Sequence, residues 1–305
     1  MTSLRVVEIR DEEAGLAFSV SPESGGELSS LRVRRGGRWL ELLHRANLFT
    51  PARKAWRGRA PWLFPAVGRS AHGERLGVWG HQGKTLPMAI HGFVMDRPWT
   101  LVSCDRRSAV CRTESDPSTR KAYPFAFELT VVYALLPDGV SVRAEVSASP
   151  SNRGPMPFCL GNHLTLALPF GGIGEAEDLS IHTPARECLL LDDRGLLTGQ
   201  SALAAYGGGT ALRADSRLAD RVLGGFEPGE CWVELRGPSG LGLRVAQTVE
   251  SDPGALRFVL YSDPARTFFC PEPWHGEPNS LNTGRALKLL APGERFEWEM
   301  VISVS

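Results

Sequence analysis

Apolar and polar residues alternate one by one in several stretches of this chain, most clearly in segment 295–302. There Phe296, Trp298, Met300 and Ile302 share one face, and the charged residues between them share the other. Successive side chains of a β-strand point to opposite faces, so the pattern predicts a strand with one buried face.

Two hairpins are predicted by the same alternation on either side of a turn. In segment 127–146, apolar residues alternate up to Leu135, Pro137-Asp138-Gly139 makes the turn, and the alternation returns afterwards. Segment 231–249 repeats the arrangement around its own Gly-Pro-Ser-Gly turn.

The frequency of glycine and proline between short strand-like runs indicates the fold class. Its 305 residues include 33 glycines and 22 prolines, which separate short strand-like runs, and no long segment has the period of a helix. We therefore expect a large, mostly antiparallel all-β sandwich with few short helices. Helical turns are expected only in segments such as 202–206. Segment 48–84 is the least strand-like, and we expect it to wrap the sandwich edge. Nothing resembles a linker or an internal repeat, which predicts a single domain over residues 1–305.

The charge pattern argues against several classes of partner. Lys plus Arg and Asp plus Glu are both 34, so the net charge is zero and no attraction to nucleic acid or an anionic membrane is indicated. The N-terminal segment is charged where a secretory signal is apolar, and no window has the 18 or more apolar residues of a membrane span. Six widely spaced cysteines without a C-x-x-C pair suggest reduced thiols, so a cytoplasmic location is expected.

Motifs for common cofactors and metals are missing. The segment "GVWGHQGKT" resembles a phosphate loop, but valine stands where that motif needs its first glycine. The chain has no H-E-x-x-H, and its seven histidines show no close ligand spacing. We therefore expect neither a metal nor a cofactor.

One carboxylate stands in an unusual place. Glu272 lies between Pro271 and Pro273, and proline restricts both its own backbone and that of the residue before it. A carboxylate on a stiff backbone suits catalysis or binding. A solvated acid in a proline-rich loop is the alternative.

Other segments combine with this one. In chain order they are "FPAVGRS", ending one residue after Arg69, "HGFVMDRPW", beginning at His91, "GNHLTLALPF", containing His163, then "CPEPWHGEPNSL" and the closing "LAPGERFEWEMVISV". Together they resemble the aldose 1-epimerase family, the galactose mutarotases and their relatives, from about Phe64 to the C-terminus. The resemblance departs after His163, where Leu164 and Thr165 replace the family's proline and aromatic residue.

The resemblance implies a galactose-mutarotase-like β-supersandwich that interconverts the α and β anomers of a free sugar without a cofactor. It implies Glu272 as the general base, His163 as the general acid, and Arg69 and His91 as residues that hold sugar oxygens. The substrate-binding aspartate is assigned to Asp220, with Asp215 as the second candidate.

The chemistry of these residue types fits the reaction. Opening a hemiacetal ring removes a proton from the anomeric hydroxyl and adds one to the ring oxygen. A glutamate with an ordinary pKa of about 4.3 and a histidine near 6.5 can share these tasks at neutral pH. Trp274 would stack on the apolar side of the sugar. Structural roles for His91 at a strand end, Arg69 at the surface and Trp274 in the core remain open.

Three other functions stay possible at this stage. A hexose-6-phosphate epimerase of the same fold would need basic residues for the phosphate, and a non-catalytic carbohydrate-binding protein would keep the pocket alone. A glycoside hydrolase would use two carboxylates, for which Glu272 and Asp220 are candidates. The physiological sugar and the oligomeric state stay open. The candidates for the phosphate are Arg53, Lys54, Arg57, Arg59 and Lys84.

Overall fold

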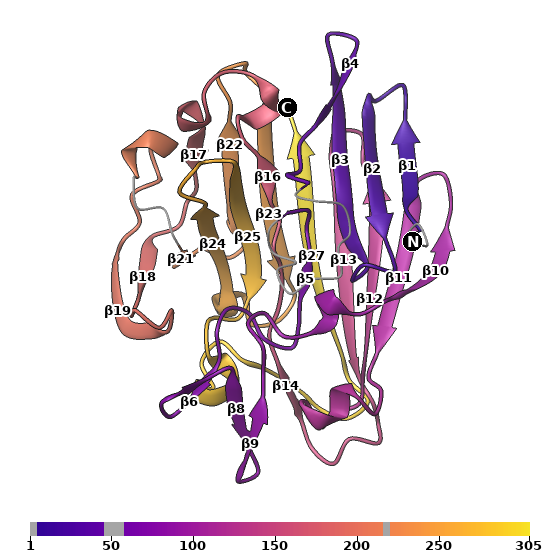
Figure 1. The fold of residues 1–305 in the computed structure, drawn as a ribbon, viewed down its shortest axis with the longest axis vertical. Helices are drawn as coiled ribbons and strands as arrows, with labels where there is room; N and C mark the ends of the chain where they lie inside the picture. Colours follow the sequence, from indigo (N-terminus) through magenta and orange to yellow (C-terminus); the bar gives the residue numbers. More distant parts are fainter. Residues whose placement is uncertain (1–4, 46–57, 216–219) are drawn as a thin grey trace.

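The computed structural model describes residues 5–45, 58–215 and 220–305. In this part of the chain nearly all regular structure is antiparallel β-sheet (Figure 1), which confirms the predicted all-β class. The α-helix of these residues is one turn, α1 (Ser280–Thr283). Short 3-10 turns occupy Val94–Asp96, Thr119–Lys121, Phe170–Gly172, Ala176–Asp178, Leu212–Ala214 and Pro253–Ala255.

The largest sheet has nine strands in the order β10-β11-β12-β13-β27-β23-β22-β17-β20. It contains both predicted hairpins. The pair β12–β13 aligns Tyr133 with Val142, and β22–β23 aligns Leu235 with Leu243. The bounds are β10 (Thr100–Cys104), β11 (Ser108–Glu114), β12 (Phe127–Leu135), β13 (Gly139–Ala148), β17 (Ser180–His182), β20 (Thr210–Ala211), β22 (Trp232–Arg236), β23 (Gly242–Val249) and β27 (Arg295–Val304).

A second large sheet has eight strands, ordered β19-β18-β21-β24-β25-β15-β5, with β16 also paired to β25. A four-stranded sheet β1-β2-β3-β4 and three two-stranded ribbons, β6–β7, β8–β9 and β14–β26, complete the described structure. The bounds are β19 (Leu197–Leu203), β18 (Glu187–Leu191), β21 (Arg221–Gly224), β24 (Leu256–Ser262), β25 (Phe268–His275), β15 (Leu160–Asn162), β5 (Trp62–Leu63), β16 (Leu166–Ala167), β1 (Val7–Asp11), β2 (Leu16–Ser21), β3 (Glu27–Arg35), β4 (Arg38–Glu41), β6 (Ala71–His72), β7 (Arg75–Leu76), β8 (Val78–His81), β9 (Lys84–Pro87), β14 (Met156–Phe158) and β26 (Lys288–Leu290).

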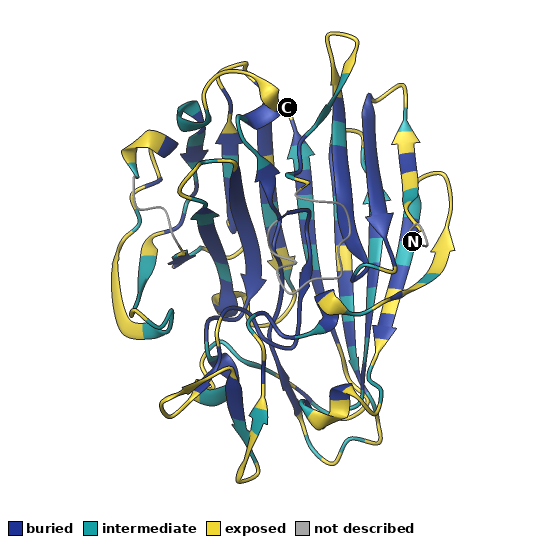
Figure 2. Cartoon of the chain, in the orientation of Figure 1, coloured by how far each residue is buried: buried dark blue, intermediate teal, exposed yellow. Residues whose placement is uncertain are grey.

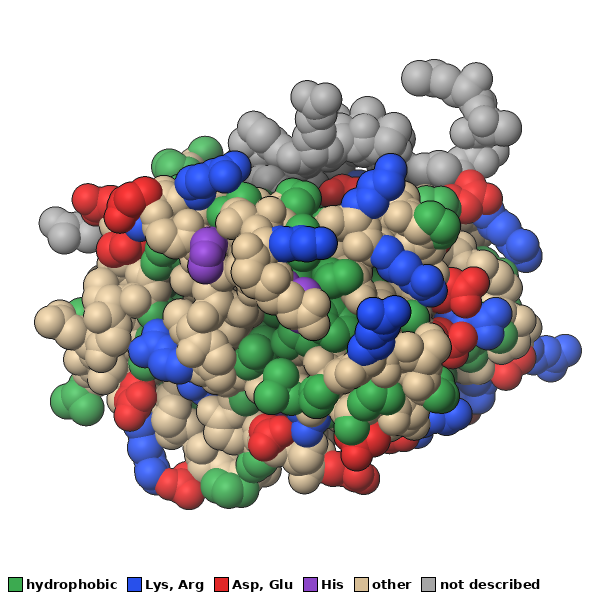
Figure 3. All heavy atoms as spheres, turned by 90° about the horizontal axis from the view of Figure 1, so that it is seen from below, with side chains coloured by type: hydrophobic (Ala, Val, Ile, Leu, Met, Phe, Trp, Pro, Cys, Tyr) green, Lys and Arg blue, Asp and Glu red, His purple; other side chains and the backbone are tan. Residues whose placement is uncertain are grey.

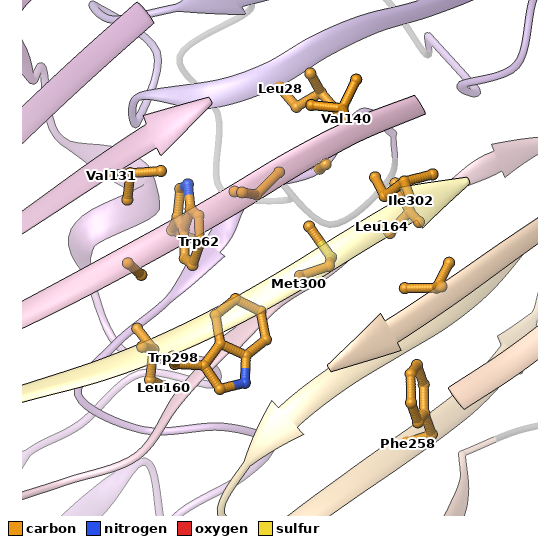
Figure 4. Close-up of a cluster of buried hydrophobic side chains, with 14 of the residues drawn as sticks. Leu28, Trp62, Val131, Val140, Leu160, Leu164, Phe258, Trp298, Met300 and Ile302 are labelled. Carbon is orange, nitrogen blue, oxygen red and sulfur yellow. The ribbon is translucent and has the colours of Figure 1, made fainter. Parts of the chain in front are cut away.

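The inward faces of these sheets meet in a large apolar core (Figure 4), and a second, smaller apolar cluster includes Val222, Val259 and Trp274. Strand β27 buries the apolar face that its alternation predicts, while the residues between are exposed or half-buried. Trp298 of this strand meets Trp62 of β5 edge to face, with 5.8 Å between ring centroids. The indole N–H groups of these two residues have partners, because Trp62 donates to the Tyr133 hydroxyl and Trp298 to the Gln247 side chain. Figure 2 shows the same division, with buried central strands and an exposed edge strand β19.

Strand β25 carries the two prolines around Glu272, and every one of its residues is buried. The solvated proline-rich loop is therefore wrong for this segment. On one side β25 pairs continuously with β24. On the other, β16 pairs only with Phe268 and Phe269, and β15 only with Trp274 and His275.

The gap between β15 and β16 explains how prolines fit inside a sheet. Proline has no N–H to donate, so it is normally confined to strand edges. Pro271 and Pro273 lie in the stretch of β25 that neither β15 nor β16 pairs. Residues 163–165 connect these two strands, and they bond instead to segment 59–61, with the N–H of His163 donating to the carbonyl of Pro61. The prolines therefore coincide with the place where His163 leaves the regular sheet.

Two sequence expectations need correction. The helical turn predicted for 202–206 is wrong, because β19 continues to Leu203 and pairs Ala202 with Cys188 of β18. Cross-strand pairing there overrides local helix propensity. Segment 48–84 contributes more than an edge wrap, since Trp62 of β5 is fully buried in the core, although residues 48–57 lie outside the described residues.

Candidate active site

One cavity, with a volume of about 180 Å³, collects all six predicted site residues. Asp215 does not line it. Its carboxylate instead accepts hydrogen bonds from Tyr206 and Arg221. The six that line the cavity are Arg69, His91, His163, Asp220, Glu272 and Trp274.

The eight-stranded sheet supplies the cavity floor. Glu272 and Trp274 are two residues apart on β25 and therefore point to the same face. Val259 of β24 is directly opposite Glu272, and Val222 of β21 is opposite Val259, so these apolar side chains join the same face. This register therefore places Glu272 beside an apolar surface.

Glu272 and His163 are in contact. Oε1 of Glu272 lies 3.3 Å from Nε2 of His163, and both side chains are almost completely buried. Burial raises the pKa of Glu272 well above its ordinary value, and the nearby Asp220 raises it further. Burial lowers the pKa of His163 to about 3. The pair is therefore most stable with no net charge, holding one proton between Oε1 and Nε2.

The second carboxylate oxygen of Glu272 faces a different environment. Oε2 is buried and has no hydrogen bond of good geometry among the described residues, although the nearby Trp274 side chain interacts with the carboxylate and lowers its pKa. A buried carboxylate oxygen without a partner destabilises a protein unless something else pairs with it. On the wall of a polar cavity, the hydroxyl of a bound ligand is a suitable partner.

His91 is held by reciprocal contacts with Gly68. The Gly68 N–H donates to Nδ1 of His91 over 3.1 Å, and the His91 N–H donates to the carbonyl of Gly68. Because Nδ1 accepts, the ring proton of the neutral imidazole lies on Nε2. Burial lowers the pKa of His91 well below its ordinary value, and the charge of Arg69 adds to this effect.

Local geometry turns His91 toward the cavity. His91 has φ of 64°, in the left-handed region, and Gly92 follows with φ of 77°. A Cβ at position 92 would lie 2.0 Å from the carbonyl oxygen of Phe64, so glycine is required there. His91 thus bonds to backbone, as its structural alternative expected, but it lies in a turn rather than at a strand end, and it also lines the cavity.

Arg69 and Asp220 lie at the exposed mouth of the cavity. Partial burial raises the pKa of Asp220, and the positive charge of Arg69 opposes that rise. Asp220 has φ of 49°, a conformation that aspartate tolerates better than most residues. The two side chains offer a donor fork and an acceptor to the same ligand.

Trp274 forms an inner wall. Its ring is 5.7 Å from that of His91, at 72°. It also packs over Gly161 of β15, the residue opposite it, where a Cβ would lie 2.7 Å from Cδ1 of the indole. The structure therefore gives Trp274 a packing role as well as a place in the cavity lining.

Three of these side chains have the spacing of a metal site, which the sequence did not predict. One ligand atom from each of His91, His163 and Glu272 lies within 4.8 Å of the other two. The tautomer of His91 opposes metal binding, because Nδ1 accepts a backbone N–H and Nε2 then carries a proton. His91 is better suited to donate a hydrogen bond to a ligand oxygen.

Sequence reasoning missed several lining residues. Alternation in segment 257–261 could have placed Val259 and Tyr261 on one face, but only once the partner strand was known. Gly195 lies in the turn between β18 and β19, and its position against the Arg69 side chain has no signal in the sequence. The missed lining residues include Leu191, Gly195, Val222, Val259, Tyr261 and Pro278.

Comparison with known proteins identifies the family of this chain. Residues 5–222 match the aldose 1-epimerase family. The chain belongs to the aldose 1-epimerase family. The match includes four of the six candidate site residues of this epimerase family member, while Glu272 and Trp274 lie beyond it.

Relatives of this family member are distant in sequence. The chromosomally encoded protein LacX of Lactococcus lactis is 26% identical over 294 residues, covering 92% of this chain and 91% of LacX. A galactose mutarotase related enzyme from Lactobacillus acidophilus superposes with a TM-score of 0.83 at 22% identity, covering 99% and 97% of the two chains. A GalM/aldose epimerase homologue from C. elegans superposes with a TM-score of 0.81 at 16% identity, with 99% of each chain covered. These likenesses confirm the galactose-mutarotase-like fold.

The structure also bears on the expectations about membrane spans and cysteines. Among the described residues, no helix is both long enough and apolar enough to cross a membrane. All six cysteines lie in this part of the chain and are free thiols. The cytoplasmic location, the single domain and the absence of a nucleic-acid partner stay predictions.

Proposed function

We propose that this protein is an aldose 1-epimerase that interconverts the α and β anomers of a free hexose. The observation that carries the proposal is the buried contact between Glu272 and His163 on the wall of a cavity that also holds sugar-binding residue types. Ring opening needs a base and an acid near one carbon atom. The anomeric hydroxyl oxygen and the ring oxygen are both bonded to the anomeric carbon, so adjacent catalytic groups can reach both.

In the proposed reaction, the proton shared by the pair starts on Nε2 of His163, and the Glu272 carboxylate starts without one. Glu272 takes the proton of the anomeric hydroxyl, the C1 to ring-oxygen bond breaks as the C1 carbonyl forms, and the ring oxygen takes the proton from Nε2 of His163. Rotation about the C1 to C2 bond presents the other carbonyl face. Ring closure then returns both protons by the reverse steps. After ring opening the shared proton lies on Glu272, and after ring closure it lies on His163 again. The site therefore ends the cycle in its starting protonation state.

The remaining residues bind the sugar in this proposal. Nε2–H of His91 and the guanidinium of Arg69 donate to ring and hydroxyl oxygens, and Asp220 accepts from a hydroxyl. Trp274 supplies the apolar wall.

The charge of the site favours a neutral sugar over a sugar phosphate. Arg69 is the one cation among the described residues that line the cavity. Of the candidates for a phosphate, Arg59 is buried in an ion pair with Glu27, and Lys84 is exposed on β9, away from the cavity lining. Arg53, Lys54 and Arg57 lie outside the described residues. Figure 3 shows both acidic and basic side chains on one face of the molecule.

Polarimetry of freshly dissolved α-D-glucose and α-D-galactose tests the proposal. Glu272→Gln and His163→Asn should each lower the enzymatic anomerisation rate at least about a hundredfold, because each removes a general catalyst. His275→Asn is a matched control, since His275 is also fully buried on β25 but lies on the opposite face from Glu272. It should keep the wild-type rate.

Other outcomes would contradict the proposal. A near-wild-type rate in either site variant would show that the role is misassigned. Sugar binding by calorimetry with no rate above buffer would indicate a non-catalytic sugar-binding protein. A hexose 6-phosphate that outcompetes the free sugar would indicate the phosphate-specific alternative.

A further inference from the structure

A buried threonine lies behind the proposed general acid. Thr165 is completely buried, and its Oγ1 is 3.4 Å from Nδ1 of His163, on the side of the imidazole away from Glu272. The same Oγ1 is 3.0 Å from the carbonyl oxygen of His163 and 3.5 Å from Sγ of Cys270. Thr165 does not line the cavity, so it acts on a ligand only through another residue.

A count of donors determines how these contacts are arranged. A threonine hydroxyl has one proton to donate and can accept two hydrogen bonds. The carbonyl oxygen of His163 can only accept, so the Thr165 hydroxyl donates to it. Oγ1 is then an acceptor toward its two other neighbours, the thiol of Cys270 and Nδ1 of His163. A hydrogen bond between Oγ1 and Nδ1 then requires a proton on Nδ1.

We propose that Thr165 is a positioning residue that fixes the orientation and tautomer of His163. With Nδ1–H held by Thr165, Nε2 is the nitrogen that faces Glu272 and exchanges a proton. Without this acceptor, the neutral imidazole can carry its proton on Nε2 alone, and Nε2 then cannot take a proton back during ring closure. The consequence for turnover rests on the proposed function, whereas the tautomer does not.

The backbone around Thr165 makes this proposal testable by substitution. Its N–H donates to the carbonyl of Arg59, and its carbonyl accepts from the N–H of His44. These bonds do not involve the side chain. Thr165→Val therefore removes the hydroxyl while it keeps the branched shape and both backbone contacts, and Thr165→Ser keeps the hydroxyl.

The kinetic experiment separates positioning from packing. Thr165→Val should lower kcat about tenfold or more, the effect of one lost hydrogen bond at the upper end of its usual range, with KM within about threefold of wild type. Thr165→Ser should restore kcat to within about threefold. The matched control is Thr183→Val, because Thr183 is equally buried and donates to the carbonyl of Trp232, and neither residue lines the cavity. It should leave kcat unchanged. An unchanged kcat in Thr165→Val, or an equal loss in Thr165→Ser, would overturn the proposal.

A measurement independent of activity reads the tautomer directly. In protein labelled with ¹⁵N-histidine, the signals of His163 are those lost in the His163→Asn variant. We expect wild-type His163 to carry a proton on Nδ1 at neutral pH, and this protonation to decrease in Thr165→Val. An unprotonated Nδ1 in the wild type would overturn the inference even if Thr165→Val failed to fold. A protonated Nδ1 in a protein without epimerase activity would instead contradict only the proposed function.

Discussion

At the residue level, the candidate site depends on a pair of buried titratable side chains that are in contact. Glu272 and His163 are both buried, so each is disfavoured in its charged form, and their contact lets them share one proton. The sequence predicted this pair only through the resemblance, because 109 positions separate the two residues. The tautomers of His91 and His163 could not be predicted, since they depend on Gly68 and Thr165 contacts.

The choice between two aspartates can be tested at this level. Asp220 lines the cavity, whereas Asp215 is bonded to Arg221 and Tyr206. Asp220→Asn should raise KM about tenfold or more, because it weakens a charged hydrogen bond to a sugar hydroxyl. Asp215→Asn should keep KM within about threefold of wild type. Steady-state anomerisation kinetics measure both, and the reverse order would assign the binding role to Asp215.

At the level of elements, strand β25 determines the shape of the site. Its prolines, its gap in pairing and the alternation of its side chains place Glu272 and Trp274 together on one face. Local sequence predicted the stiffness of this segment but not its burial, since proline-flanked acids are more common in exposed loops. The failed helix at 202–206 has the same cause, because its partner strand β18 was unknown.

The contact between β15 and β25 gives a prediction about packing. Gly161→Ala would put a Cβ 2.7 Å from Cδ1 of Trp274, so the indole must move into the cavity or the strands must separate. We expect a loss of about 1–3 kcal/mol in the free energy of unfolding, typical of overpacking, together with a higher KM. Urea unfolding and steady-state kinetics check both effects.

Gly154→Ala is a suitable control for that experiment. No atom lies within 4 Å of the Cβ position at residue 154, and its φ is not in the left-handed region. This variant should change neither KM nor the free energy of unfolding appreciably. An equally mild effect of Gly161→Ala would show that Trp274 has more room than the structure indicates.

At the level of the whole molecule, the supersandwich buries titratable groups outside the active site as well. His275 is fully buried against Phe296, and neither ring nitrogen has a hydrogen-bond partner among the described residues. Burial lowers the pKa of His275 to about 4. Alternation and turns predicted the sheets of this fold, whereas the burial of His275 depends on how the sheets pack together.

This buried histidine predicts a pH dependence of stability. Between about pH 6.5, the ordinary histidine pKa, and pH 4, the unfolded chain binds the His275 proton more readily than the folded protein. The contribution of neutral His275 is therefore fully present above that window and is lost as the pH falls through it. In His275→Leu, the decrease in unfolding free energy from pH 7 to pH 5 should be smaller than in wild type, by about 2 kcal/mol.

Urea unfolding at the two pH values measures this difference. His72→Leu, which changes an exposed histidine on β6, is the control and should show the wild-type dependence. An unchanged pH dependence in His275→Leu would show that the fold does not hold His275 neutral.

The central claim is that Glu272 and His163 act as one proton-transfer unit on a single sugar. Magnetisation-transfer NMR at equilibrium measures the exchange between the anomers of D-galactose, with the concentration of each variant raised until its rate exceeds that of buffer. Glu272→Gln and His163→Asn should each slow exchange at least about a hundredfold, and the double variant should lie within about tenfold of the slower single variant. Losses that multiply fully in the double variant, or a single variant that exchanges at nearly the wild-type rate, would contradict the claim.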